Sequence, residues 1–398
     1  MSRLWDKGAP LDERVLAFTA EEDHRLDERL VAGDVRASIA HAQMLRAQGL
    51  LSAVDFAAIR DGLAALGDEH ARGLWRIELG DEDVHTALER RLTERIGDAG
   101  GRVHLGRSRN DQVLATLRLY LKDEIVALAA GARAVAAALD AVAAAHPGQP
   151  LPGYTHGQRA MPSSVELWAG GFRAQLEDDA DGVEACRRRI DRNPLGSAAG
   201  YGTPALPVDR ESTRAALGFA TTEEPVTAVQ LARGKGEAQL LFELTLLATD
   251  LGRLAADLVL FASAEFGFVE LPAEMTTGSS IMPQKRNPDL FELVRAGGAT
   301  ALAALVEALA IPAKLPSGYH RDLQRLKAPL FRAIDLAHAT CDLLAATLPR
   351  VRFVPERLAL PPELFAAEQA HRLVIAEGIP FREAYRHVAA KLEERRTH

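Results

Sequence analysis

Three apolar stripes at helical spacing are the feature that most restricts what this chain can fold into. Each stripe advances by alternating steps of four and three residues, so its members lie along one face of a long α-helix. The stripes run over residues 121–142, 240–261 and 330–348. Long helices with narrow apolar seams are expected to pack side by side at shallow angles, so the stripes predict a helical bundle.

The rest of the chain also favours helices over strands. Strand signals are few, and strands do not alternate with helices in the way that builds a parallel sheet. Gly-, Pro- and Ser-rich breaks separate the helical segments, at residues 147–153, 193–207, 271–288 and 311–318. We therefore predict an all-α subunit of three domains with a long central bundle. The domains are an N-terminal helical domain (1–105), the bundle (106–348) and a short C-terminal helical domain (349–398).

Composition and charge indicate which partners and which cellular compartment to expect. The 398 residues include 47 Lys and Arg against 55 Asp and Glu, a net charge of −8 without a basic stripe, so we expect no nucleic-acid partner. The two cysteines, Cys186 and Cys341, lie far apart in the chain, as is typical of a reducing compartment. The first residues lack a signal-peptide pattern. The apolar stretch 125–145 is interrupted by Arg133 and Asp140, so it predicts a core helix and no membrane partner. We expect a cytoplasmic protein.

Five polar segments lie at or beside the breaks, where loops at helix ends often carry function. They are Asp83–His85, Gly106–Gln112, Gly153–Gln158, Gly278–Pro288 and Tyr319–Gln324. The Gly278–Pro288 segment can expose consecutive backbone N–H groups and hydroxyls. Lys285 and Asn287 add a positive charge and an amide, which together suit a carboxylate whose negative charge grows during a reaction. Taken alone, the segment also fits an ordinary surface loop.

The string Gly278-Ser-Ser-Ile-Met-Pro-Gln-Lys-Arg-Asn-Pro288 closely resembles the signature of the fumarase/aspartase superfamily. Members of that superfamily release fumarate by reversible β-elimination. The segments Gly106–Gln112 and Gly153–His156 resemble the versions of two other shared regions in the argininosuccinate lyase branch. Asp83–His85 and Tyr319–Lys327 also match that branch, and the resemblance extends over roughly residues 10 to 390.

The resemblance implies a function and an assembly. It implies cleavage of argininosuccinate into arginine and fumarate, the last step of arginine biosynthesis. It also implies a nearly all-helical, three-domain subunit in a homotetramer, in which the three shared regions of each active site come from three different subunits. No cofactor and no metal are expected, since the sequence holds no HExxH motif, CxxC pair or clustered ligand spacing.

The resemblance also assigns the catalytic residues. Ser279 is expected to be the base that removes the proton beside a carboxylate, once positive charge, loop N–H groups and exclusion of water have lowered the pKa of its hydroxyl. Lys285 is expected to stabilise the carbanion, with Asn287 hydrogen-bonding the same group. His156 is expected to pair with Glu292 as an acid–base group. Two roles for His156 stay open: proton donor, or orienting group for water and substrate.

Arg109, Asn110 and Thr155 are implied to hold the carboxylates of the succinyl half of the substrate, for which a bidentate arginine is well suited. Two positions depart from the family pattern. Asp23 stands where many relatives carry a serine against the arginine moiety, which makes it a candidate ligand. Gly157 stands where leucine is common, and we expect it to loosen the turn beside His156.

Tyr319, Gln324 and Lys327 are implied to bind the argininyl end, where an amide and a lysine can meet an α-carboxylate. Asp83 and His85 are expected on the guanidino side or behind the residues that touch the substrate. These two residues complete the predicted site.

Three alternatives compete with this hypothesis. The first is a sibling lyase acting on adenylosuccinate, aspartate or malate, which the Gly106–Gln112 and Tyr319–Lys327 segments argue against. The second is a P-loop protein, because Gly101–Ser108 is one residue from Gly-x4-Gly-Lys-Ser; it lacks the lysine and a preceding strand. The third is a structural homologue without activity, which the full set of polar residues argues against.

Overall fold

The chain divides into two compact units, which are described separately. The structure, a computed structural model, describes residues 12–397, so residues 1–11 and 398 at the outer ends of the predicted terminal domains lie outside the described residues. Unit 1 comprises Met1–Ala129, Asp181–Thr245 and Ala299–Ala337, and unit 2 comprises Ala130–Ala180, Leu246–Gly298 and His338–His398. The division into three domains stays a prediction.

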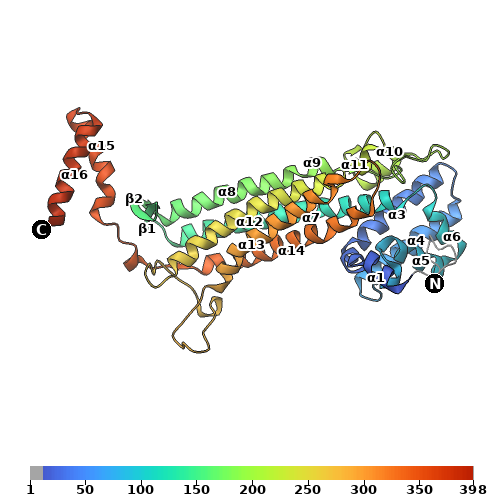
Figure 1. Ribbon diagram of the computed structural model, residues 1–398, viewed down its shortest axis with the longest axis horizontal. Helices are drawn as coiled ribbons and strands as arrows, with labels where there is room; N and C mark the ends of the chain where they lie inside the picture. The colour runs from blue at the N-terminus through green and yellow to red at the C-terminus, as the bar shows by residue number, and fades with distance from the viewer. Residues whose placement is uncertain (1–11, 398) are drawn as a thin grey trace. The chain divides into compact units, whose positions relative to one another are not determined.

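Five long helices contribute segments to both units and account for the apolar stripes (Figure 1). They are α7 (Arg109–Ala145), α8 (Val165–Ala185), α12 (Lys235–Phe261), α13 (Asp289–Ala310) and α14 (Lys327–Thr347). The stripes of residues 121–142, 240–261 and 330–348 belong to α7, α12 and α14 with the turn that follows it, and every stripe residue is buried. The long helices predicted from the stripes are therefore present.

Contacts within each unit join these helices. In unit 1, Arg332 of α14 forms an ion pair with Glu307 of α13 at 3.1 Å. In unit 2, the indole N–H of Trp168 on α8 donates to Asp257 of α12 at 2.9 Å. A Cβ atom built on Gly131 of α7 would lie 3.3 Å from the Cβ of Cys341 on α14, so glycine permits the close approach of these two helices.

The remaining helices of unit 1 are four to 19 residues long. They are α1 (Glu13–Ala20), α2 (Asp23–Leu26), α3 (Val31–Ala47), α4 (Ala53–Ala71), α5 (Val84–Ile96), α6 (Asp98–Gly101), α9 (Arg187–Ile190), α10 (Arg210–Leu217) and α11 (Ala228–Leu231). α3, α4 and α5 pack on one another. One apolar cluster in this unit joins α3, α7 and α10 with the loops beside α10, through Ala37, Ala40, Ala115, Leu119, Leu195, Leu217 and Phe219.

The N-termini of several of these helices are fixed by side-chain caps that the sequence supplies. Ser52 accepts from the backbone N–H of Asp55 at 3.0 Å and starts α4, and Asp83 accepts from Thr86 at 2.9 Å and starts α5. The Asp83 cap matters for the site, because the start of α5 fixes the positions from which the side chains of Asp83 and His85 extend. The Gly101–Ser108 segment begins at the last residue of α6 and contains a 3₁₀ turn, so a helix precedes it where a P-loop would require a strand.

A β-hairpin in unit 2 begins within the predicted break of residues 147–153 and continues past it to residue 164. Strands β1 (Pro150–Thr155) and β2 (Gln158–Ser164) pair antiparallel, with Thr155 opposite Gln158. The two turn residues, His156 and Gly157, have φ values of 55° and 70°, the left-handed conformation of a two-residue hairpin turn. Gly157 adopts this conformation without steric cost, so it favours the tight turn instead of loosening it.

Two further strand pairs are two residues long: β3 (Arg192–Asn193) pairs parallel with β4 (Thr221–Thr222), and β5 (Val269–Glu270) pairs antiparallel with β6 (Arg352–Phe353). Unit 2 ends in the helical hairpin of α15 (Ala366–Glu377) and α16 (Phe381–Thr397). The 3₁₀ turns are η1 (Asp27–Leu30), η2 (Leu79–Asp81), η3 (Arg102–His104), η4 (Ala273–Met275), η5 (Pro312–Lys314), η6 (Arg321–Leu326), η7 (Leu348–Arg350), η8 (Pro355–Arg357) and η9 (Pro362–Phe365).

Two helical stretches, Arg109–Ala145 and Asp289–Lys314, have the length and apolar composition of a membrane-crossing helix, a property that core helices share. Half of the most apolar part of Arg109–Ala145 is buried, as a core helix requires. Little of Asp289–Lys314 is buried within the single chain. Its exposed apolar side chains include Leu302, Val306 and Leu309, which lie on one face of α13.

Candidate functional site

Eight of the predicted site residues line one cavity of about 150 Å³ in unit 1, which we name the Asp83 pocket. They are Asp23, Asp83, His85, Arg109, Asn110, Tyr319, Gln324 and Lys327. Three separate stretches of chain bring most of them together: the start of α5, the start of α7, and the segment that leads into α14. The pocket gathers cationic and anionic side chains within the same small volume.

Arg109 and Asp83 form the central ion pair of the pocket. The guanidinium Nε of Arg109 donates to Asp83 Oδ2 at 2.8 Å, and its Nη2 contacts the same oxygen. Burial opposes the charged form of Asp83, but the charges of Arg109 and His85 outweigh it and lower the pKa of Asp83 to about 2. Arg109 stays partly exposed. Asp83 therefore orients the guanidinium while leaving part of it open to a ligand.

His85 is held from behind by Asp34. Its Nδ1 lies 3.0 Å from Asp34 Oδ1, and the hydroxyl of Thr116 donates to the same oxygen at 3.2 Å. Burial by itself would lower the pKa of His85, but the attraction of Asp34 raises it above the ordinary value. No described residue forms a hydrogen bond with His85 Nε2, which is buried. That nitrogen donates to a molecule in the pocket when the imidazole is protonated and accepts when it is neutral.

Lys327 bridges two carboxylates at the base of the pocket. Its Nζ lies 2.6 Å from Asp27 Oδ1 and 2.9 Å from Asp23 Oδ2, and the side chain is 2% exposed. Its pKa is raised, because the two carboxylates outweigh the effect of burial. Burial raises the pKa of Asp23 to about 7, helped by Asp27 and opposed by Lys327. One ammonium thus serves two carboxylates, of which Asp23 keeps its proton up to near neutral pH.

The raised pKa of Asp23 predicts a specific dependence of stability on pH. Between the unfolded value of about 4 and the folded value of about 7, the folded chain holds a proton that the unfolded chain has lost. The free energy of unfolding therefore falls as the pH rises through this window. We expect Asp23→Asn to show a smaller fall than the wild type in urea unfolding at a series of pH values. The exposed Asp61→Asn serves as control and should keep the wild-type slope, and the same slope in Asp23→Asn would contradict the assignment.

Gln324 holds the edge of the pocket through neighbouring groups. Its side-chain amide donates to the carbonyl of Thr19 at 2.9 Å, and its oxygen accepts from Arg321 Nε at 3.1 Å. Arg321 also pairs with Glu82 at 3.2 Å. Gln324 is thus part of the pocket wall.

The other six predicted residues belong to unit 2. Thr155 and His156 lie at the exposed end of the β1–β2 hairpin, and Glu292 is exposed in the first turn of α13. Among the described residues, no hydrogen bond or ion pair joins His156 to Glu292. The pairing predicted between them is therefore not formed within one chain.

The Gly278–Pro288 segment forms a loop that projects from the end of the helices in unit 2 (Figure 1). Its two ends are pinned together, because Thr277 and Asn287 exchange two backbone hydrogen bonds of 2.9 and 3.1 Å. The hydroxyl oxygen of Ser279 accepts from the backbone N–H of Met282 at 3.2 Å. The amide of Asn287 donates to the carbonyl of Gly278 at 3.4 Å, so it also stabilises the loop. Lys285 is exposed on the same loop.

A protein-family model described as Lyase matches residues 8–302 of this chain. The chain is 48% identical to the argininosuccinate lyase of Sorangium cellulosum, over 98% of this chain and 90% of that protein. It is 45% identical to the argininosuccinate lyase of Stenotrophomonas maltophilia, over 97% of this chain and 90% of that protein. The chain belongs to the argininosuccinate lyase family.

The fold of this argininosuccinate lyase family member agrees with that placement. It matches the crystal structure of a class II fumarase from Schistosoma mansoni with a TM-score of 0.80 over 97% of this chain and 91% of that one, at 19% identity. The prediction of an all-α, fumarase/aspartase-like fold is therefore confirmed, as is the prediction of a carbon–nitrogen lyase. The alternative of a sibling lyase is not supported by these relatives.

The pocket also holds residues that the sequence patterns did not predict. They are Asp27, Glu82, Val113, Arg233 and Arg321. Arg233, just before α12, is 3% exposed, and its Nε and Nη1 form no hydrogen bond with any described residue. Its Nη2 donates to the carbonyl of Leu323 at 3.4 Å, and Glu237 lies 3.9 Å from its Nε. The signal in the sequence is the Gly234-Lys-Gly236 break that follows Arg233 at the start of an apolar stripe.

Proposed function

We propose that this chain catalyses the reversible β-elimination of argininosuccinate to arginine and fumarate. In this reaction a proton leaves the carbon beside a carboxylate, the bond from carbon to the guanidino nitrogen breaks, and that nitrogen takes up a proton. The observation that supports the proposal is that eight of the residues implied by the family resemblance line one cavity, the Asp83 pocket. The chain that holds this pocket is 48% identical to the argininosuccinate lyase of Sorangium cellulosum. Loss of fumarate release in Ser279→Ala, argued in the Discussion, is the direct test.

Ser279 is the proposed base. A serine hydroxyl needs strong stabilisation of its deprotonated form, and the backbone N–H of Met282 already donates to its oxygen at 3.2 Å. Lys285, on the same pinned loop, supplies the positive charge that stabilises both the alkoxide and the carbanion. The backbone hydrogen bonds between Thr277 and Asn287 close the loop that carries Ser279 and Lys285. A closed loop loses less conformational entropy when these two residues bind the substrate.

His156 and Glu292 form the proposed acid–base pair, with His156 as proton donor or as orienting group. The hairpin turn presents the imidazole to solvent at the tip of a short, rigid element. Because the two residues do not meet within the described chain, the pair requires a second subunit. Glu292 of one subunit then faces His156 of another, and the carboxylate fixes the tautomer of the imidazole.

The Asp83 pocket is the proposed binding site for the substrate. Arg109 and Asn110, with Thr155, hold the succinyl carboxylates, and the carboxylates of the pocket face the guanidino group. Asp83 and Glu82 supply those negative charges, and Asp23 adds its charge once the pH exceeds its pKa of about 7. Tyr319, Gln324, His85 and Lys327 complete the wall of the site.

Arg233 is the proposed partner of the α-carboxylate at the argininyl end. The ammonium of Lys327 already contacts Asp27 and Asp23, whereas two nitrogen atoms of Arg233 have no hydrogen bond within the described residues. A buried guanidinium with open donors is costly in the free protein, and a bound carboxylate removes that cost.

A cytoplasmic homotetramer with shared active sites is the proposed assembly. The exposed apolar face of Leu302, Val306 and Leu309 on α13 is the kind of surface that a partner subunit buries. Two buried free cysteines, Cys186 and Cys341, suit a reducing compartment. The substrate and both products are small molecules of amino-acid biosynthesis.

Shared sites predict that two inactive variants restore activity when they are mixed. We expect Arg109→Gln, altered in the Asp83 pocket, and Ser279→Ala, altered in the loop, to be inactive as pure tetramers. If the two residues of a site come from different subunits, random mixing leaves about one site in four with both residues intact. Denaturing and refolding the two variants together should therefore restore about a quarter of wild-type fumarate release.

Each variant refolded alone is the control and should stay inactive. Mixed tetramers that remain as inactive as the controls would contradict shared sites, provided that mass spectrometry shows the subunits have exchanged. Activity of a purified monomer would contradict them as well.

A further inference from the structure

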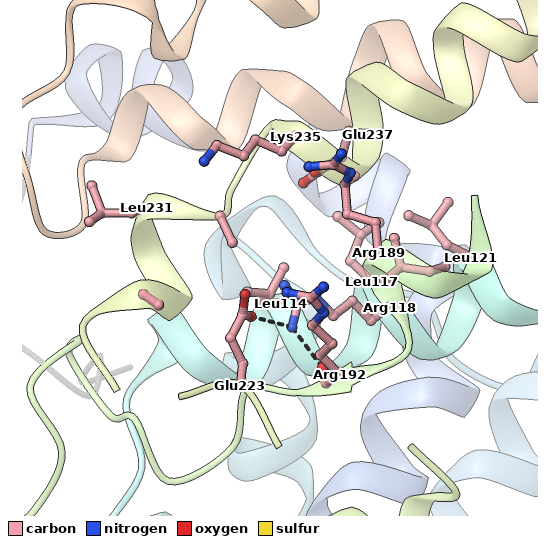
Figure 2. A pocket seen from close by; sticks show the side chains of 14 residues that line it. Leu114, Leu117, Arg118, Leu121, Arg189, Arg192, Glu223, Leu231, Lys235 and Glu237 are labelled. Carbon is pink, nitrogen blue, oxygen red and sulfur yellow. Dashed lines mark hydrogen bonds and ion pairs between the residues drawn. The ribbon is translucent and has the colours of Figure 1, made fainter. Parts of the chain in front are cut away.

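Unit 1 contains a second cavity, of about 340 Å³, which shares no lining residue with the Asp83 pocket. We name it the Arg118 cavity. Its walls come from α7, from α9 and β3, and from the stretch of residues 223–237 (Figure 2). None of the residues assigned to the lyase reaction lines it. Its volume falls in the range of small-molecule sites.

The floor of the cavity contains buried charges. Arg118 and Glu223 form an ion pair of 2.6 Å, and both side chains are almost fully buried. The same nitrogen of Arg118 also donates to the carbonyl of Arg192 at 2.6 Å, as Figure 2 shows. This pair is internally balanced and therefore fixes the floor of the cavity without attracting a ligand of either charge.

Glu237 adds a negative charge beside this pair, with Arg233 as its ion-pair partner and with one oxygen that accepts no hydrogen bond from the described residues. It is 4% exposed, and its Oε2 accepts from the backbone N–H of Gly234 at 3.0 Å. Its Oε1 accepts no hydrogen bond from any residue that the structure describes, and Arg233 Nε lies 3.9 Å away. A buried carboxylate oxygen without a hydrogen bond is costly, so it is a place for a donor carried by a bound molecule.

The mouth of the cavity has the opposite charge. Arg189, Arg192 and Lys235 are exposed residues of the lining, and Figure 2 labels their side chains. Arg189 is partly fixed, because its Nε donates to Gln239 at 2.8 Å. Three cations at the mouth favour an anionic group at the outer end of a ligand.

An apolar wall lies between the charged floor and the charged mouth. Leucine side chains of α7 and α11 supply it, at Leu114, Leu117, Leu121 and Leu231. Such a wall favours a chain of methylene groups, because their burial removes apolar surface from water.

We propose that the Arg118 cavity binds a zwitterion whose cationic and anionic ends are separated by an aliphatic chain, the chemistry of ω-amino acids. The ammonium or guanidinium end donates to Glu237 Oε1, the methylene groups contact the leucines, and the carboxylate meets Arg189, Arg192 and Lys235. A purely anionic ligand of the same length would place no hydrogen-bond donor against Glu237 Oε1. A purely cationic ligand would be repelled at the mouth.

Isothermal titration calorimetry of the intact enzyme with 6-aminohexanoate and hexanoate tests the proposal. We expect 6-aminohexanoate to bind at one site per chain, and hexanoate, which lacks the ammonium group, to bind at least about tenfold more weakly. The double variant Arg189→Glu/Lys235→Glu should weaken binding of 6-aminohexanoate by at least about tenfold and leave kcat and KM for argininosuccinate unchanged.

Arg188→Glu is the matched control, since Arg188 is exposed on α9 but does not line the cavity, and it should bind as the wild type does. Absence of binding to the wild type, or equal binding of hexanoate, would overturn the proposal. Unchanged binding in the double variant, or loss of binding in Arg109→Gln, would assign the ligand to the Asp83 pocket instead and overturn it equally.

Discussion

Replacing Ser279 with alanine is expected to reduce kcat for fumarate release by at least about 10³-fold, because the reaction then has no base at the carbon that loses its proton. The backbone N–H of Met282 donates to the Ser279 oxygen, and Lys285 follows on the same loop. These groups can stabilise an alkoxide only where the hydroxyl oxygen exists. The ultraviolet absorbance of fumarate measures the loss directly.

Ser280→Ala is the matched control for this experiment. Ser280 is the next residue of the loop and is exposed, and no catalytic role is proposed for it, so its variant should keep kcat within a few-fold of the wild type. Circular dichroism should show both variants to be as helical as the wild type. Full fumarate release by Ser279→Ala would show that another group removes the proton.

The bundle could be predicted from the sequence because its signal is local and repeated. The residues of each stripe, such as Leu240 to Phe261, repeat one spacing over many turns, and burial of one helical face imposes that spacing. The β1–β2 hairpin has no comparable signal. Its strands contain Pro150, Pro152 and Pro162 and bury little of one face, so the segment looks like a break.

The candidate site could be predicted only as a set of residues, and the partners of those residues could not. Lys327 lies 300 positions from Asp27 in the chain, and no spacing rule indicates that they meet. Arg109 and Asp83 are 26 positions apart on separate helices, and their ion pair depends on where the Asp83 cap starts α5. Long-range pairing of this kind follows from packing of the whole unit.

The burial of Arg233 in the site could not be predicted from the sequence either. Arginine is usually exposed, so an arginine before a long helix looks like a solvated residue. Its burial follows from the contact of the 228–237 segment with the chain around Leu323, which no local pattern records.

Replacing Arg233 with glutamine is expected to raise KM for argininosuccinate roughly 100-fold, since each charge-assisted hydrogen bond to a buried carboxylate is worth about 1.5–3 kcal/mol. The proposed contact is with the α-carboxylate, which keeps its charge throughout the reaction and lies far from the carbon that loses its proton. Arg233 therefore binds the ground state and the transition state equally, and kcat should change by less than about tenfold. Steady-state kinetics separates the two parameters.

Arg325→Gln is the matched control for Arg233→Gln. Arg325 lies in the neighbouring η6 turn, pairs with Glu21 at 3.1 Å and does not line the Asp83 pocket, so its loss should leave both parameters near the wild-type values. A thermal unfolding midpoint close to that of the wild type would show that Arg233→Gln is folded. A fall in kcat with KM unchanged would place Arg233 at the reacting end of the substrate. Unchanged kinetics would leave the open nitrogen atoms of Arg233 without a role in substrate binding.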